Sequence, residues 1–161
     1  MSEKPINEFN QRIVQEGIFS IKNLSKSVID WFEENNYYYS INDSTTKEKS
    51  HGTETRLLFT GYMLIDDFAK SEIKVDFFLL NAGKVTSKGK KLDKGDLEIR
   101  ITGDLIVDYK HRFSSKFKSF LLKLYMKYLI PEKFLYHYES KVYDDSFSVF
   151  NLLKEEMGLS T

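Results

Sequence analysis

The chain of 161 residues contains no cysteine and carries no excess of either charge. Without cysteine it can form no disulfide, no thiol nucleophile, no iron–sulfur cluster and no cysteine-bearing zinc site. It also lacks an uncharged run of about 18 apolar residues, the length that a membrane-spanning helix needs. Its first residues show no apolar stretch of the kind found in signal peptides. These absences predict a cytoplasmic protein without a transmembrane segment.

Lysine plus arginine and aspartate plus glutamate number 24 each, so the formal net charge is zero. A neutral molecule produces no strong long-range field, and any electrostatic function must arise from local asymmetry. Hydrophobic residues make up 41% of the chain and aromatic residues 15%, which is typical of a globular protein. The length suits a single domain that buries roughly two thirds of the surface of its unfolded chain.

The period of the apolar residues changes along the chain. Between residues 55 and 109 apolar side chains recur at every second position, and from residue 116 onward they recur at every third and fourth. The first period is that of a half-buried strand and the second is that of an amphipathic helix. We therefore predict an α+β domain: an antiparallel meander sheet of four to five strands, with one N-terminal and two C-terminal helices on one face. Odd-numbered sheet residues should face the helices and even-numbered ones the solvent.

The N-terminal third contains one clear helix. Residues 1–16 are polar with isolated apolar positions, which favours an N-terminal arm over a short helix, so the folded domain is predicted to span 17–161. Ser20 is a plausible N-cap, and Asn35 and Asn36 end the helix. A strand at 37–41 and a polar loop or hairpin tip at 42–52 follow. The apolar residues of the predicted helix share one stripe: Ile21, Leu24, Val28, Trp31 and Phe32.

Turns and breaks divide the remaining chain. Residues 81–95 contain three glycines and five lysines, which predicts a long, mobile hairpin. Gly61 and Gly103 interrupt strands and are expected to mark bulges or bends. Two helices are predicted at 114–130 and from 132 to about 157, because Pro131 breaks the path and suits a first helical turn while Gly158 can stop the second.

Five segments carry a resemblance to other proteins: DWFEENNY (30–37), IDDFAK (65–70), GKKLDKGDL (89–97), FKSFLLKLYMKYLI (117–130) and YESKVY (138–143). Through these segments, residues 17–158 resemble a set of small uncharacterised archaeal α+β proteins. The resemblance implies the architecture and transfers no site residues, because no activity is established for the set. The chain departs from it at 110–113, where KHRF stands in place of glycine, tryptophan and an acid.

The basic residues that follow this departure share one helix face: Arg112, Lys116, Lys123 and Lys127. Their spacings of four, seven and four residues place them on one narrow stripe if the helix reaches back to 112. Such a stripe can contact phosphate groups of nucleic acid or of anionic lipid. The alternative is a helix that packs between the sheet and the final helix and keeps its lysines in water.

A second basic cluster lies in the predicted hairpin. Its candidate contacts to an anionic partner are Lys88, Lys90 and Lys91, with Lys84 and Lys94 nearby. Asp93 and Asp96 dilute the charge of this cluster. The alternative interpretation is that exposed lysines keep a surface loop soluble.

No catalytic, cofactor-binding or metal-ligating set is predicted. His51, His111 and His137 are far apart in sequence, and none has the partner four residues away that a helical zinc site uses. Asp66 and Asp67 are typical turn residues and lack further carboxylates at supporting spacing. The pair at 144–145 is interpreted as a solvated patch on the last helix.

Two functions remain open from the sequence. The first is a noncatalytic binding or assembly module that contacts a protein partner, nucleic acid or an anionic membrane surface through the basic helix face. It is favoured by the two lysine clusters and by the lack of a convergent reactive set. The alternative is a small-ligand carrier or enzyme with an apolar cavity between sheet and helices, where aromatic side chains can line a pocket. The oligomeric state is left open.

Overall fold

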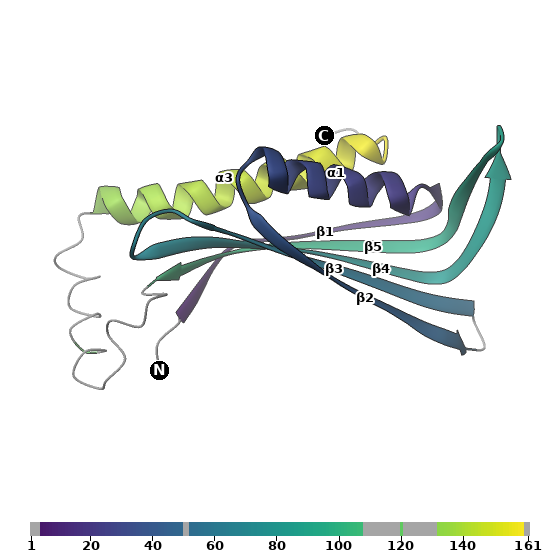
Figure 1. Ribbon diagram of the computed structural model, residues 1–161, viewed down its shortest axis with the longest axis horizontal. Coiled ribbons are helices and arrows are strands. Elements are labelled where there is room, and N and C mark those ends of the chain that lie inside the picture. The colour runs from purple at the N-terminus through teal and green to yellow at the C-terminus, as the bar shows by residue number, and fades with distance from the viewer. Residues whose placement is uncertain (1–3, 50–51, 108–119, 121–131, 160–161) are drawn as a thin grey trace.

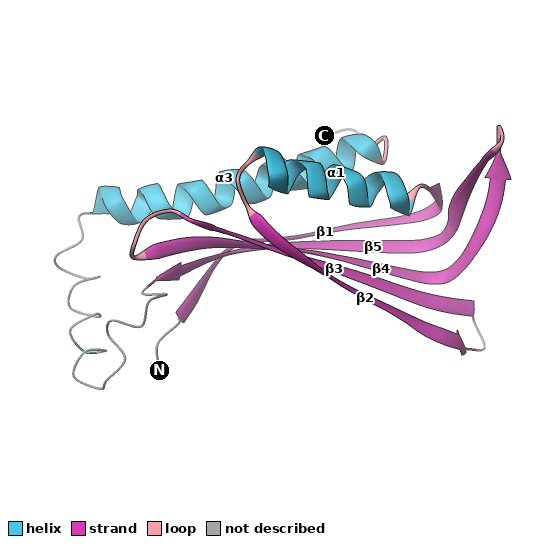
Figure 2. Cartoon of the chain, viewed as in Figure 1, coloured by secondary structure: helices cyan, strands magenta, loops and turns pink. Residues whose placement is uncertain are grey.

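A computed structural model describes residues 4–49, 52–107, 120 and 132–159. Figure 1 shows a twisted sheet with two helices lying across one of its faces, and Figure 2 separates the same chain into helices and strands. The strands are β1 (Lys4–Phe19), β2 (Tyr38–Lys49), β3 (Gly52–Leu64), β4 (Ala69–Ser87) and β5 (Lys90–Val107); the helices are α1 (Ile21–Glu34) and α3 (Glu132–Glu156). The α+β class with an antiparallel sheet is as predicted.

The described strands form one sheet in the order β1-β5-β4-β3-β2, and each neighbouring pair is antiparallel. Strands β2 to β5 follow one another as the predicted meander. Strand β1 forms the edge next to β5 and pairs with it over nearly its whole length. The sheet therefore has β1 and β2 as its two edges.

The prediction of an N-terminal arm at 1–16 is wrong, because residues 4–19 form strand β1. The apolar side chains of this strand on the core side are Ile6, Phe9, Ile13 and Phe19, and the last three are buried. A register shift between Asn7 and Phe9 interrupts the alternation. An edge strand with so few apolar positions and a bulge lacks a clear period of two, and its pairing with β5 is a long-range contact.

The faces of the sheet follow the predicted alternation in the described residues. Odd-numbered positions of β4 and β5 are buried beneath α1 and α3, including Ile73, Val75, Phe77, Ile99 and Ile101. Because successive strand residues point to opposite faces, this burial commits the even-numbered positions to the other side. The helices and the odd face thus form one main apolar core and a smaller second cluster of Ala69, Leu105, Val107 and Val142.

The opposite face of the sheet is charged, as predicted. Arg56 donates two hydrogen bonds to Asp76 at 3.0 and 2.8 Å. Glu98 lies 3.7 Å from Arg12 and 3.6 Å from Arg100. Exposed ion pairs of this kind contribute at most about 1 kcal/mol each. They keep this face soluble without holding the sheet together.

Helix α1 begins and ends where the sequence predicts. The Ser20 side chain accepts a hydrogen bond from the backbone N–H of Asn23 at 3.1 Å, which satisfies one of the free donors of the first turn. Asn35 is the C-cap. The apolar stripe of α1 packs onto the sheet through Leu24, Val28, Trp31 and Phe32.

Helix α3 crosses the sheet above β5, β1 and β4. Val142, Val149 and Leu153 are fully buried against the sheet, and Gly158 just beyond the helix has a φ of 73°, which suits a helix stop. The other predicted C-terminal helix, 114–130, lies outside the described residues, as do Arg112, Lys116, Lys123 and Lys127.

The long, mobile hairpin predicted at 81–95 is a paired ladder. Strand β4 continues to Ser87 and β5 begins at Lys90, so the connection is Lys88 and Gly89 alone. Both have positive φ, 50° and 79°, as in type I′ turns, whose twist matches that of the flanking strands. Likewise β2 extends to Lys49 where a loop was predicted at 42–52. Both segments are rich in polar residues, which suggested loops. Strands pair through backbone groups, so polar side chains do not prevent them from forming a ladder.

Two strand glycines allow the helices to approach the sheet closely. A Cβ on Gly61 would lie 2.3 Å from the Phe32 ring, and a Cβ on Gly103 would lie 1.9 Å from Ser146 Oγ. The predicted bulge is present next to Gly103, where β1 shifts register, whereas Gly61 sits in regular pairing. Close packing of the helices is therefore the structural role of both residues.

Candidate functional site

The sheet bends at a line of glycines near one end. Gly17 in β1 pairs with Gly95 in β5, and both have positive φ, 143° and 156°. In the next strand, β4 shifts register between Leu80 and Gly83. Glycine adopts such backbone angles without a steric penalty, and an extra strand residue increases local bending. Beyond this line the β4–β5 hairpin curls toward the helix layer, past the first turn of α1 (Figure 1).

The curl borders a pocket of about 700 Å³ between the hairpin, the start of α1 and the start of β3. Its apolar wall is formed by Ile21, Leu57 and Leu79. The remaining lining residues are polar, charged or glycine: Ser20, Lys22, Ser25, Thr55, Gly83, Lys84, Lys91 and Asp93. An apolar wall with a few polar groups is the usual composition of a small-molecule site.

Asp93 fastens the hairpin to the helix. Its side chain is nearly buried, with the residue 9% exposed. One carboxylate oxygen accepts the backbone N–H of Ile21 at 3.0 Å, and the other pairs with the ammonium of Lys84. A carboxylate at this position also interacts favourably with the positive end of the α1 dipole. These contacts hold the wall of the pocket in place.

Ser25 lies one turn further along α1 than Ile21 and lines the same pocket. Its hydroxyl oxygen is buried and has no hydrogen-bond partner among the described residues. A buried hydroxyl without a partner costs about 1–3 kcal/mol. The fold therefore retains an unsatisfied polar group at the wall of this pocket.

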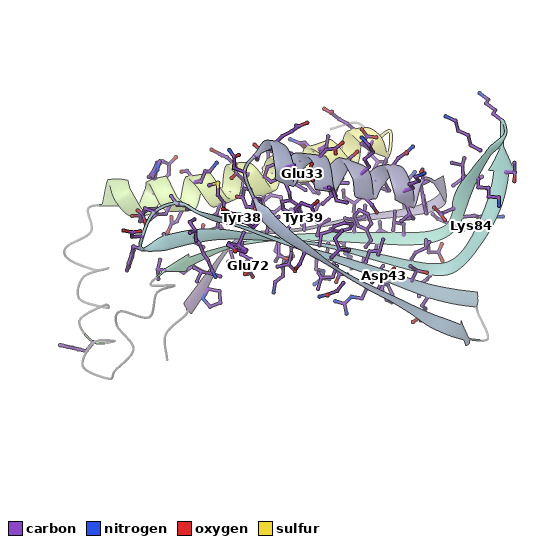
Figure 3. The ribbon with its side chains drawn as sticks, in the orientation of Figure 1. Glu33, Tyr38, Tyr39, Asp43, Glu72 and Lys84 are labelled. Carbon is purple, nitrogen blue, oxygen red and sulfur yellow. The ribbon has the colours of Figure 1, made fainter. Side chains whose placement is uncertain are left out.

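The structure divides the basic hairpin cluster that the sequence indicates. Lys84 and Lys91 line the pocket, whereas Lys88 and Lys90 are exposed at the turn and do not line it. Figure 3 shows Lys84 on the curled part of the hairpin, beside the N-terminal end of α1. Lys22, from the first turn of α1, joins the two lining lysines, and no sequence pattern indicated this association.

A separate buried network connects α3 to the sheet. The Tyr37 hydroxyl donates to Asp145 at 2.7 Å and lies 2.8 Å from the Ser71 hydroxyl. Burial, and then the bond to Asp145, raise the pKa of Tyr37. Asp145 also pairs with Lys141 at 3.0 Å. The interpretation of residues 144–145 as a solvated patch is thus wrong for Asp145, which serves to position α3.

The turn at Asp66 is as predicted and serves a similar purpose. Asp66 accepts the backbone N–H groups of Phe68 and Ala69 at 2.7 and 2.9 Å, and it also accepts the hydroxyl of Tyr138 from α3. Partial burial opposes ionisation, but the hydroxyl and the two amides outweigh it and lower the pKa of Asp66. Asp66 therefore ties the β3–β4 turn to the final helix.

Other classes of site find no support in the part of the chain that the structure describes. Among these residues no cluster of histidine and acidic side chains is placed to hold a metal ion. Likewise, neither described helix combines the length and the apolar composition needed to cross a bilayer. A second pocket of about 510 Å³ between α1 and α3 is acidic, with Asp144 and Glu155 in its lining.

No family model, curated protein or solved structure matches the chain. The resemblance to small archaeal α+β proteins therefore stays a prediction. Function has to be argued from the pocket and its residues.

The glycines of the hairpin were the one signal for this pocket in the sequence, but the polar composition around them suggested a loop. Gly83, Gly89 and Gly95 fall close together, which indicated a loose hairpin. Only the pairing of Gly95 with Gly17 shows that the glycines lie on one bend line across neighbouring strands. The association of residues 20–25 with 79–93 depends on that bend.

Proposed function

We propose that this protein is a noncatalytic module that binds a small, partly apolar ligand in the pocket between the curled hairpin and α1. The observation that carries the proposal is the pocket itself, about 700 Å³ in volume, with an apolar wall of Ile21, Leu57 and Leu79 and polar residues around it. Its volume lies within the range of roughly 300–1,000 Å³ that small-molecule sites occupy. Of the two functions that the sequence left open, this geometry favours the small-ligand carrier.

The lining residues favour binding over catalysis. The acidic side chain at the wall, Asp93, is held by Lys84 and by the backbone of Ile21. The hydroxyls of Ser20 and Ser25 have no described base as a hydrogen-bond partner: Ser20 accepts from the Asn23 amide, and Ser25 has no partner. A nucleophile normally needs a base within hydrogen-bonding distance. The site can hold and orient a ligand with the groups that it presents.

The other function, contact with an anionic macromolecule or a protein partner through a basic helix face, stays a prediction. Arg112, Lys116, Lys123 and Lys127 lie outside the described residues. Cytoplasmic localisation likewise remains an expectation from the sequence. Neither expectation conflicts with a small-ligand site at the start of α1.

The proposal is tested with an uncharged apolar fluorophore, N-phenyl-1-naphthylamine, excited at wavelengths that tryptophan does not absorb. We expect saturable binding at one site per chain. Leu57→Trp places a large ring in the pocket and should abolish this binding. Leu58→Trp is the matched control, because Leu58 is the next residue of β3 and points to the other face of the sheet.

Thr55→Trp provides a second blocking variant, since Thr55 lines the pocket near the start of β3 and is only partly buried. Circular dichroism and thermal melts establish that each variant is folded. Absence of saturable binding to the wild-type protein would refute the proposal. Equal loss of binding in Leu57→Trp and Leu58→Trp would place the fluorophore elsewhere and would refute it as well.

A further inference from the structure

We propose, resting on the function above, that the natural ligand is an amphipathic anion: an apolar body with a carboxylate or phosphate head group. The body would pack against Leu57 and Leu79. The head would lie at the mouth of the pocket between Lys22 and Lys91, within reach of the Ser25 hydroxyl. The argument depends on the charges of the lining, on how Asp93 is engaged, and on the unsatisfied polar group.

The lining has an excess of positive charge in a molecule whose total charge is zero. Three lysines line the pocket, namely Lys22, Lys84 and Lys91, and Asp93 is the one acidic residue of the lining. The local field therefore favours an anion.

Asp93 does not cancel this field, because its charge is already engaged. It is nearly buried, and its two oxygens are occupied by the Ile21 N–H and the Lys84 ammonium. Asp93 thus neutralises Lys84 and the helix end. Lys22 and Lys91 are exposed at the mouth and keep their charge for a ligand. An amphipathic cation would meet these two ammonium groups first and be repelled.

The Ser25 hydroxyl provides the third observation. It is buried at the pocket wall with no partner, although most buried polar groups in proteins are hydrogen-bonded. A hydroxyl rotates freely and can donate to an anionic oxygen. A ligand head group would satisfy Ser25 and would offset the cost that this residue imposes on the free protein.

The size of the pocket limits the anion to a small molecule. A volume of about 700 Å³, closed on one side by β3 and on the other by the hairpin, admits a single short chain or ring system. The lysines at the hairpin tip, Lys88 and Lys90, do not line it. A polyanion that binds the tip and a small anion that enters the pocket consequently depend on different lysines.

The test compares head groups on one chain length. Octanoate, octyl phosphate, 1-octanol and octyltrimethylammonium, each below its micelle-forming concentration, compete with N-phenyl-1-naphthylamine. We expect octanoate or octyl phosphate to displace the fluorophore at concentrations about tenfold lower than octanol, as two favourable charge interactions would give. The cation should be the weakest competitor. The preference should shrink as salt is raised, because exposed charges are screened.

Two double variants locate the head group. Lys22→Met with Lys91→Met should bring octanoate to the level of octanol, and neither substitution disturbs the Asp93–Lys84 pair. Lys88→Met with Lys90→Met removes the same charge from the same protein end and should leave the preference unchanged. Equal competition by all four compounds would overturn the inference, as would an equal effect of the two double variants.

Ser25→Ala separates a ligand contact from a purely structural role. We expect this variant to be at least as stable as the wild-type protein, since an unsatisfied hydroxyl is removed, and to bind octanoate severalfold more weakly. Unchanged octanoate affinity would overturn the role of Ser25. If the fluorophore binds the pocket but shows no head-group preference, the amphipathic anion is wrong while the small-ligand function stands. If neither the fluorophore nor octanoate binds in calorimetry, the function itself fails.

Discussion

Replacing Gly103 by alanine tests how closely α3 lies over the sheet. A Cβ at this position would lie 1.9 Å from Ser146 Oγ, 3.0 Å from Ser146 Cβ and 3.3 Å from Val142 Cγ1. Both helix residues are fully buried. The Cβ atom of Ser146 is fixed by the backbone of α3, so rotation of the Ser146 side chain cannot relieve that contact. We therefore expect Gly103→Ala to push α3 from β5 or to distort the strand.

The cost can be estimated from the three contacts. Rotation of Ser146 relieves the shortest one but breaks its hydrogen bond to the Val142 carbonyl oxygen, which measures 2.7 Å and is worth about 1 kcal/mol. The contact between the two Cβ atoms remains after that rotation. Overpacking of a core costs about 1–3 kcal/mol. We expect Gly103→Ala to lower the free energy of unfolding by about 3 kcal/mol.

Urea unfolding followed by far-ultraviolet circular dichroism and by the fluorescence of Trp31 measures this loss. Adding Ser146→Ala removes the oxygen of the shortest contact, so the double variant should be about 1 kcal/mol more stable than Gly103→Ala alone. Gly83→Ala is the matched control, because nothing lies within 4 Å of its Cβ position; we expect a change within about 0.5 kcal/mol. Wild-type stability in Gly103→Ala would refute the close approach of α3.

Three further predictions concern the contacts that hold turns and helices. Tyr37→Phe should cost about 1.5–3 kcal/mol, because it removes a bond to the carboxylate of Asp145. The pKa of Tyr37 is raised, so its contribution is full below about pH 10 and declines as the pH rises further; urea melts of the two proteins at pH 8 and 11 measure this decline. Asp66→Asn should cost about 1 kcal/mol at pH 7. The pKa of Asp66 is lowered, so its contribution is present above about pH 4 and disappears as acid protonates the folded protein; the thermal melts of the two proteins should draw together as the pH is lowered below that value. Gly89→Ala should cost about 1–2 kcal/mol through its positive φ without changing fluorophore binding, and a loss of less than 0.3 kcal/mol would contradict the turn geometry.

The polar contacts of α3 explain why its position could not be derived from the sequence. Its apolar residues predict a helix that packs on the odd face of the sheet, and this is what the structure shows. The partners of Asp145 and Tyr138 are Tyr37 and Asp66, which lie 108 and 72 residues away. The sequence around Asp145 does not indicate whether its carboxylate faces solvent or bonds to a buried group such as the Tyr37 hydroxyl.

In the candidate site, too, local sequence predicts part of the arrangement and contacts between distant segments decide the rest. The excess of lysine in residues 84–94 is visible in the sequence, and it indicated a basic region. Which lysines act together was not visible, because Lys22 comes from a helix some 60 residues earlier and joins Lys84 and Lys91 only when the hairpin curls over it. The unsatisfied hydroxyl of Ser25 is likewise a property of its packed surroundings.

Local sequence decides which segments are strands or helices at 55–80, 96–107 and 132–157, which face of these strands is buried, and where Ser20 begins α1. These depend on side-chain periodicity and on capping residues, which neighbours along the chain decide. Tertiary structure alone decided that β1 completes the sheet and that Gly17 and Gly95 align to bend it over α1. Strand register sets those pairings, and register is a relation between distant segments that no short stretch of sequence contains.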